Sequence, residues 1–107
     1  MVSPAAYNIL LVLADGEQHG YAIMQEIEQL SGGTEAVGPT TLYRTIRQLL
    51  EQGLIEELRA RPDDADQRRR YYRLTTAGRK AAVAETQRLD NLVRIAHKKR
   101  ALRQRTA

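Results

Sequence analysis

The sequence predicts a mainly α-helical chain that carries one small β-hairpin. Apolar residues recur at three- and four-residue intervals in four stretches, which is the spacing of helices with one buried face. Between the third and fourth stretches lie two short runs with strand-forming residues, separated by the turn-forming segment ARPDDADQ. The predicted order is therefore helix, helix, helix, hairpin, helix. A chain of 107 residues has the length of one domain with one hydrophobic core.

The first two predicted helices have clear start and stop signals. Ser3 and Pro4 begin the first helix, which is strongly apolar and ends at the sequence ADG. The second helix begins near Gly20 and ends at the sequence SGG, because glycine favours the backbone that closes a helix. The buried stripe of the second helix is expected to consist of Tyr21, Ile23, Met24, Ile27 and Leu30.

The third helix is predicted between the start signal Gly38-Pro39 and the stop signal Gly53. Its buried stripe is expected to be Leu42, Ile46, Leu49 and Leu50. The opposite face carries hydroxyl, phenol and guanidinium groups, and no carboxylate precedes Glu51. Such groups hydrogen-bond phosphate oxygens and base edges. The candidate DNA contacts on this helix are Thr40, Thr41, Tyr43, Arg44 and Arg47.

The cationic residues are unevenly distributed. Residues 1–58 hold two basic and eight acidic side chains, residues 59–87 hold eight and four, and residues 88–107 hold seven and one, which gives the net charge of +4. Both cations of the acidic segment, Arg44 and Arg47, lie one turn apart on the third helix. A merely solvated face, which is the alternative, would more often mix Glu with Lys. This placement therefore favours a polyanionic partner.

The two strand-like runs, LIEEL and RRYYRLT, predict an antiparallel hairpin with a charged tip. Helices followed by such a hairpin are the plan of a winged helix-turn-helix, whose third helix enters the major groove of DNA. Strand alternation predicts that Tyr72 and Leu74 face the core, whereas Tyr71 and Arg73 point away. Three further candidate DNA contacts lie at the tip, where acidic neighbours can partly neutralise them: Arg68, Arg69 and Arg70. A solvated loop is the alternative.

The sequence HGYAI at the start of the second helix adds two candidates, His19 and Tyr21. The backbone N–H groups of a helix start can receive a phosphate. The alternative is that His19 caps the helix or packs against it and that Tyr21 belongs to the core.

Catalytic and metal sites are not expected. The chain has no cysteine, its only histidines are His19 and His97, and it contains no Ser-His-acid arrangement and no glycine-rich phosphate loop. We therefore predict that the protein is not an enzyme and uses no cofactor or metal.

Thr75 or Thr76 begins the final predicted helix, whose apolar stripe is interrupted at Lys98. A helix of this length outruns the core of a small domain, so the surplus stripe needs a partner surface. The alternative is that the stripe covers only its own domain. The expected homodimer interface is Leu89, Leu92, Val93 and Ala96. We thus predict a winged-helix unit over residues 1–75, and a dimerisation helix with a basic tail over residues 76–107.

Three segments, HGYAIMQEIEQLSGG, VGPTTLYRTIRQLLEQGLIEE and RRRYYRLTTAGRKA, resemble the winged-helix core of the PadR-like transcriptional regulators over about residues 7–85. The resemblance implies a bacterial or archaeal homodimeric repressor of palindromic operators, with residues 39–52 as the reading helix and the hairpin as the wing. The short C-terminal part is similar to the subgroup with one dimerisation helix. Some members release DNA on binding phenolic or multidrug-like ligands, but this chain has no Trp or Phe to stack a flat ligand.

The combined prediction is a sequence-specific DNA-binding transcriptional regulator, a repressor that binds double-stranded DNA as a homodimer in the cytoplasm. No apolar run approaches membrane-spanning length, and the first residues lack the basic leader of a signal peptide. The competing hypothesis is an adaptor that uses its winged helix to bind protein, because a fold alone does not set function. A steep salt dependence of DNA binding would separate the two hypotheses.

Overall fold

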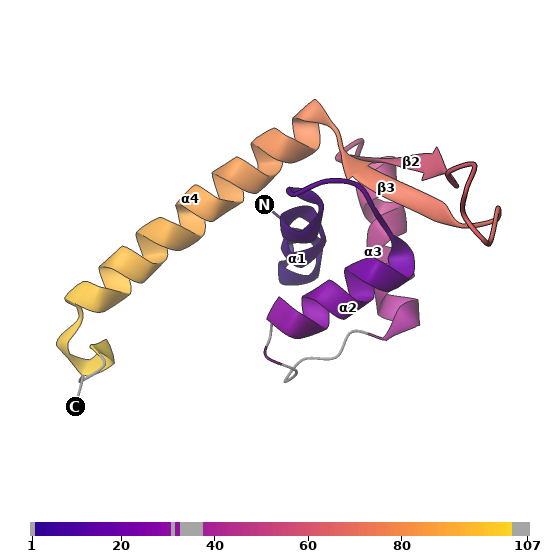
Figure 1. Ribbon diagram of the computed structural model, residues 1–107. Coiled ribbons are helices and arrows are strands. Elements are labelled where there is room, and N and C mark those ends of the chain that lie inside the picture. Colours follow the sequence, from indigo (N-terminus) through magenta and orange to yellow (C-terminus); the bar gives the residue numbers. More distant parts are fainter. Residues whose placement is uncertain (1, 31, 33–37, 104–107) are drawn as a thin grey trace.

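The computed structural model describes residues 2–30, 32 and 38–103. It contains the predicted helices and hairpin, with one additional strand and a short 3-10 helix after the last predicted helix (Figure 1). The predicted end of the second helix, residues 31–33, lies outside the described residues except for Gly32. The elements in chain order are α1 (Pro4–Leu13), β1 (Gln18–His19), α2 (Gly20–Leu30), α3 (Pro39–Glu51), β2 (Ile55–Arg59), β3 (Arg70–Leu74), α4 (Thr76–Lys98) and the 3-10 helix η1 (Arg100–Leu102).

The helix boundaries follow the local signals in the sequence. Ser3 begins α1, where its hydroxyl oxygen accepts the backbone N–H of Ala6 at 3.2 Å. Thr75 begins α4 in the same way and accepts the N–H of Gly78 at 3.0 Å. Beyond the end of α3, Gly53 has a φ of +72°, the left-handed backbone that closes a helix. These three predicted boundaries are confirmed.

The sheet is three-stranded and antiparallel, in the order β1-β3-β2. The predicted hairpin of β2 and β3 is confirmed, with Ile55 opposite Leu74 at its base. The strand β1 was not predicted. It has only two residues and pairs with β3, with Gln18 opposite Tyr72. Two residues are too short to show a strand pattern, so only the tertiary contact with β3 defines this strand.

The core lies where α1, α2 and α3 pack together beside the sheet. The predicted stripe of α3 is confirmed, because Leu42, Ile46 and Leu49 are each at most 2% exposed and Leu50 is half-buried against the core. Burying a side chain of this size stabilises a fold by about 1.5 to 3 kcal/mol. Thr45 is buried on the same helix, where its hydroxyl donates to the backbone carbonyl of Thr41 at 2.9 Å. The buried cluster comprises Ala6, Ile9, Leu10, Val12, Leu13, Ile23, Ile27, Leu42, Ile46, Leu49, Ile55 and Tyr72.

The predicted stripe of α2 was too wide. Ile23 and Ile27 are buried, but Tyr21 and Leu30 expose 59% and 56% of their surfaces. Tyr21 lies two residues before Ile23, about 200° around the helix, and therefore faces away from the core. Leu30 is the last residue of α2, beyond the last buried position of that helix.

Helix α4 leads away from the body of the domain (Figure 1). Its first half packs against α1, where the Tyr7 and Thr86 hydroxyl oxygens lie 2.7 Å apart. In its second half, Leu92 and Val93 expose 49% and 50% of their surfaces. Among the described residues, neither α4 nor any other helix combines the length and apolar character needed to cross a membrane.

Candidate nucleic-acid interface

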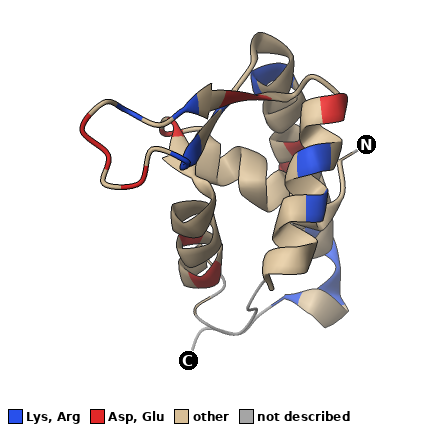
Figure 2. Cartoon of the chain, turned by 90° about the vertical axis from the view of Figure 1, so that its right-hand side faces the viewer, with Lys and Arg blue, Asp and Glu red and all other residues tan. Residues whose placement is uncertain are grey.

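The polar face of α3 is open to solvent. Thr40, Thr41, Arg44 and Arg47 are exposed, and Tyr43 exposes 48% of its surface. The buried residues of α3 alternate with these along the chain and lie on the opposite face of the helix. Packing of that buried face against the core therefore directs the polar face outward. Figure 2 shows that the cationic bands of α3 and of the hairpin are visible on the same side of the molecule. Tyr43 of α3 lines the same hollow as the arginines of the hairpin, so the two elements border a common surface.

Six of the ten candidate contacts surround one hollow of about 360 Å³ between α2, α3 and the hairpin. The remaining four, Thr40, Thr41, Arg44 and Arg47, lie outside the hollow on α3. Two lining residues that the sequence did not single out as contacts, Gly20 and Tyr72, complete its wall together with Asp66. The candidates that line the hollow are His19, Tyr21, Tyr43, Arg68, Arg69 and Arg70.

Gly20 determines how closely Tyr43 approaches the start of α2. A Cβ atom added to Gly20 would lie 2.5 Å from the phenol oxygen of Tyr43 and 3.0 Å from its ring. No side chain larger than glycine fits there unless the tyrosine moves. The sequence showed Gly20 only as a helix start, because nothing local indicates that a residue of α3 packs against it.

His19 and Tyr21 have different surroundings. The Nδ1 atom of His19 accepts the backbone N–H of Ala22 at 3.3 Å, and its ring meets Tyr71 edge-on with 5.7 Å between centroids. Burial, followed by the nearby Arg69 charge, lowers the pKa of His19 and favours the neutral ring that can accept this hydrogen bond. These contacts show that His19 caps and packs against the start of α2, and its place in the wall of the hollow also keeps it a candidate DNA contact. Tyr21 is exposed at the rim of the hollow and does not belong to the core.

Two of the three candidate arginines of the hairpin are paired with acidic residues of the same loop, as expected, whereas Arg70 donates to the carbonyl oxygens of Arg68 and Arg69. The Nε atom of Arg68 donates to Asp66 at 3.2 Å, while Arg69 lies 3.9 Å from Asp64. The Arg68 side chain is nevertheless 92% exposed. Because water screens exposed ion pairs, these contacts leave the arginines able to bind a phosphate.

Tyr71 lies on the predicted face of β3, outside the core cluster, but its exposed fraction is only 7%. Its outward face is covered by the ring of His19 and by the guanidinium of Arg61, which lies 4.8 Å from the ring centroid. The phenol donates to Asp64 at 2.9 Å. Tyr72, on the other face of β3, is also buried, and burial raises its pKa to about 12. Strand alternation separates the two faces but does not show that both are covered.

Residues 9–84 match the family model of the transcriptional regulator PadR-like family. The chain is 40% identical over 88 residues to the transcriptional regulator Rv3488 of Mycobacterium tuberculosis, which covers 81% of this chain and 77% of that protein. It is 38% identical over 84 residues to an uncharacterised 37.1 kDa protein in a transposon of Streptomyces fradiae. This match covers 78% of the chain but spans only 22% of that longer relative.

Solved structures show the same fold. A PadR family transcription regulator from Clostridium difficile has a TM-score of 0.79 at 19% identity, covering 90% of this chain and 97% of that chain. The structure of Bacillus subtilis PadR in complex with operator DNA has a TM-score of 0.68 at 22% identity. The match covers 78% of this chain and 46% of that chain. The winged helix, the family model and the mycobacterial relative agree, and this chain belongs to the transcriptional regulator PadR-like family.

Proposed function

We propose that this regulator is a repressor that binds a palindromic operator as a homodimer in the cytoplasm. The exposed face of α3 carries the proposal. The first 58 residues hold two cations against eight acidic residues, and both cations, Arg44 and Arg47, are exposed on this helix beside Thr40 and Thr41. That Bacillus subtilis PadR binds operator DNA supports DNA as the partner. A small-molecule effector rests on the family resemblance alone and is the least supported partner of the proposal, because the chain has no Trp or Phe to stack a flat ligand.

In the proposed complex, α3 lies in the major groove and the hairpin is the wing. Arg44 and Arg47 can each donate two hydrogen bonds to a guanine edge. Thr40 and Thr41 lie at the helix start, where backbone N–H groups favour a phosphate. The groups proposed to bind the DNA backbone around the hollow are His19, Tyr21, Tyr43, Arg68, Arg69 and Arg70.

Replacing Arg44 or Arg47 by alanine is expected to weaken binding to the preferred operator by about 1 to 3 kcal/mol if the residue reads a base. The operator can be selected from random duplexes by the purified protein, and affinities then measured by fluorescence anisotropy on selected and random DNA. Arg79→Ala removes the same charge from an exposed position on α4 and is the control. Equal losses on both DNAs would make the arginine a phosphate contact. Wild-type protein without salt-dependent duplex binding would contradict the proposal and favour the adaptor.

Replacing Arg68, Arg69 and Arg70 together by glutamine is expected to reduce the salt dependence of DNA binding. The slope of log affinity against log salt concentration should flatten by about one unit for each phosphate that the variant no longer binds, because fewer counterions are released. Titrations at several salt concentrations measure this slope. A slope equal to that of the wild type would exclude the wing from the interface.

We divide the chain into a DNA-binding unit, residues 1–75, and a dimerisation unit, residues 76–107. The proposed dimer forms through the second half of α4, which lies in the dimerisation unit. The exposed fractions of Leu92 and Val93, 49% and 50%, support this assignment, because a second copy would remove apolar surface from water. Twofold symmetry then matches a palindromic site with two half-sites. The residues proposed for the interface are Leu89, Leu92, Val93 and Ala96.

A further inference from the structure

The loop that joins β2 to β3, residues 60–69, is braced by two of its own side chains. One carboxylate oxygen of Asp64 accepts the backbone N–H of Arg61 at 2.6 Å, and the other accepts the phenol of Tyr71 at 2.9 Å. The side-chain amide of Gln67 donates to the carbonyl oxygens of Arg61 and Asp64 at 3.0 and 2.8 Å. These bonds join the two sides of the loop, so they restrict its conformation.

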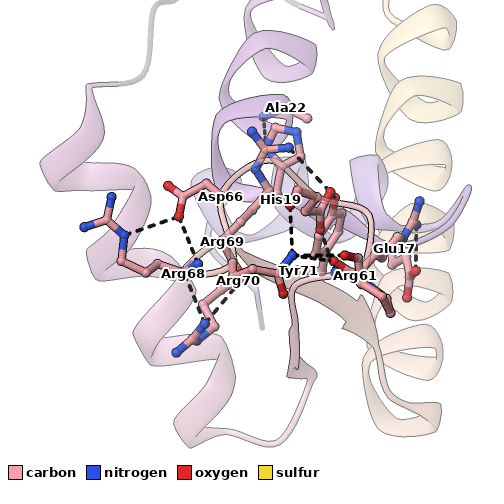
Figure 3. Close-up of polar contacts among 12 residues, drawn as sticks. Glu17, His19, Ala22, Arg61, Asp66, Arg68, Arg69, Arg70 and Tyr71 are labelled. Carbon is pink, nitrogen blue, oxygen red and sulfur yellow. Dashed lines mark hydrogen bonds and ion pairs between the residues drawn. The ribbon is translucent and has the colours of Figure 1, made fainter.

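The braced loop is also attached to the body of the domain. The guanidinium of Arg61 lies 2.7 Å from the carboxylate of Glu17, which precedes β1 (Figure 3). The same guanidinium covers the ring of Tyr71, and His19 packs against the edge of that ring. Asp64 therefore contacts β1 indirectly, because Tyr71 packs against His19 of β1 and Arg61 binds Glu17 just before it. These contacts fix the position of the loop relative to the hollow.

Asp64 differs from the other acidic residues of the loop in its surroundings. Its side chain is 12% exposed, whereas that of Asp66 is 50% exposed and Asp63 is an exposed residue. Desolvation alone would raise the pKa of Asp64, but the hydrogen bonds from Arg61 and Tyr71 and the nearby Arg69 hold it below its ordinary value. The carboxylate is therefore ionised at neutral pH, and its charge is directed into the loop.

A negative charge in a loop that faces DNA should weaken binding, because it repels phosphates. The contacts of Asp64 point to the opposite effect. We infer that Asp64 is a positioning residue of the wing, which holds the loop so that Arg68, Arg69 and Arg70 meet the DNA backbone together. A preorganised loop loses less conformational entropy on binding than a free one. This inference rests on the proposed DNA-binding function.

Two matched variants separate positioning from simple charge. Asp63→Ala and Asp64→Ala each remove one negative charge from the same loop, so charge alone predicts equal or tighter DNA binding for both. Asp63→Ala is expected to follow this prediction. Asp64→Ala is expected to bind operator about tenfold more weakly, with a salt slope about one unit flatter, because the arginines no longer meet phosphates together.

Tyr71→Phe removes one hydrogen bond to Asp64 without changing the charge of the loop. It should also weaken DNA binding, by about threefold.

Circular dichroism and thermal unfolding establish that each variant is folded before its affinity is compared. If Asp64→Ala binds DNA as tightly as Asp63→Ala with an unchanged salt slope, the inference is wrong. If Asp64→Ala does not fold, Tyr71→Phe decides, and wild-type affinity would overturn the inference. Failure of the wild type to bind DNA in a salt-dependent manner would instead overturn the proposed function. If the wild type binds but the triple arginine variant keeps the wild-type slope, the wing contact and the inference fail while binding by α3 stands.

Discussion

Leu92→Glu is expected to sediment as a monomer and to bind a palindromic operator about 100-fold or more weakly than the wild type. Leu92 exposes 49% of its surface on the part of α4 that leads away from the body. In the proposed dimer, the new carboxylate would be buried against an apolar surface, at a cost of several kcal/mol unless it is protonated or the subunits separate. Separation relieves this cost most easily, and each monomer then occupies only one half-site.

Val83→Glu is the matched control for this variant. Val83 lies on the same helix with a similar exposed fraction, 52%, but is nine residues away and so on the opposite face. It should remain a dimer. Circular dichroism should stay helical for both variants, because Leu42, Ile46 and Leu49 form the core elsewhere. A Leu92→Glu protein that stays dimeric with undiminished operator affinity would show that this part of α4 is not the interface.

Gly78→Ala is expected to lower the free energy of unfolding by about 3 kcal/mol, the upper end for overpacking a core. Gly78 is buried in the first turn of α4, against the backbone of Leu54. An added Cβ would overlap the Leu54 carbonyl oxygen and lie 2.9 Å from its carbonyl carbon. Backbone cannot move aside like a side chain, so α4 would shift. This shift would disturb the hydrogen bonds from Thr75 to Gly53 and Leu54, at 2.6 and 3.1 Å.

Urea denaturation at one fixed protein concentration measures this loss, because the stability of a dimer depends on concentration. Gly38→Ala is the control. A Cβ at Gly38 meets no atom within 4 Å, and the φ of Gly38 is −69°, so the change should cost at most about 1 kcal/mol as a poorer helix cap. Equal stabilities of Gly78→Ala and the wild type would mean that the start of α4 can move away from Leu54 at little cost.

Local signals in the sequence were sufficient to identify the helices, the hairpin and the family. Caps and stops act over three or four residues, so Ser3, Thr75 and Gly53 could be recognised without a structure. The apolar stripe of α3 also indicated which face of that helix would be exposed. Membership of the family confirms the prediction that the protein is a transcriptional regulator and not an enzyme. Repression, the palindrome and the homodimer remain predictions.

What covers each face, and which candidate residues meet, depends on packing between distant parts of the chain. Tyr71 is buried because Arg61 and His19 lie over it, and β1 exists because β3 offers it a partner. Gly20 is required because a tyrosine of α3 packs against it. These relations join residues far apart in the chain, whereas periodicity and capping describe only near neighbours. The polar face of α3 could therefore be predicted from the sequence. The hollow beside it could not, because residues from three elements form it.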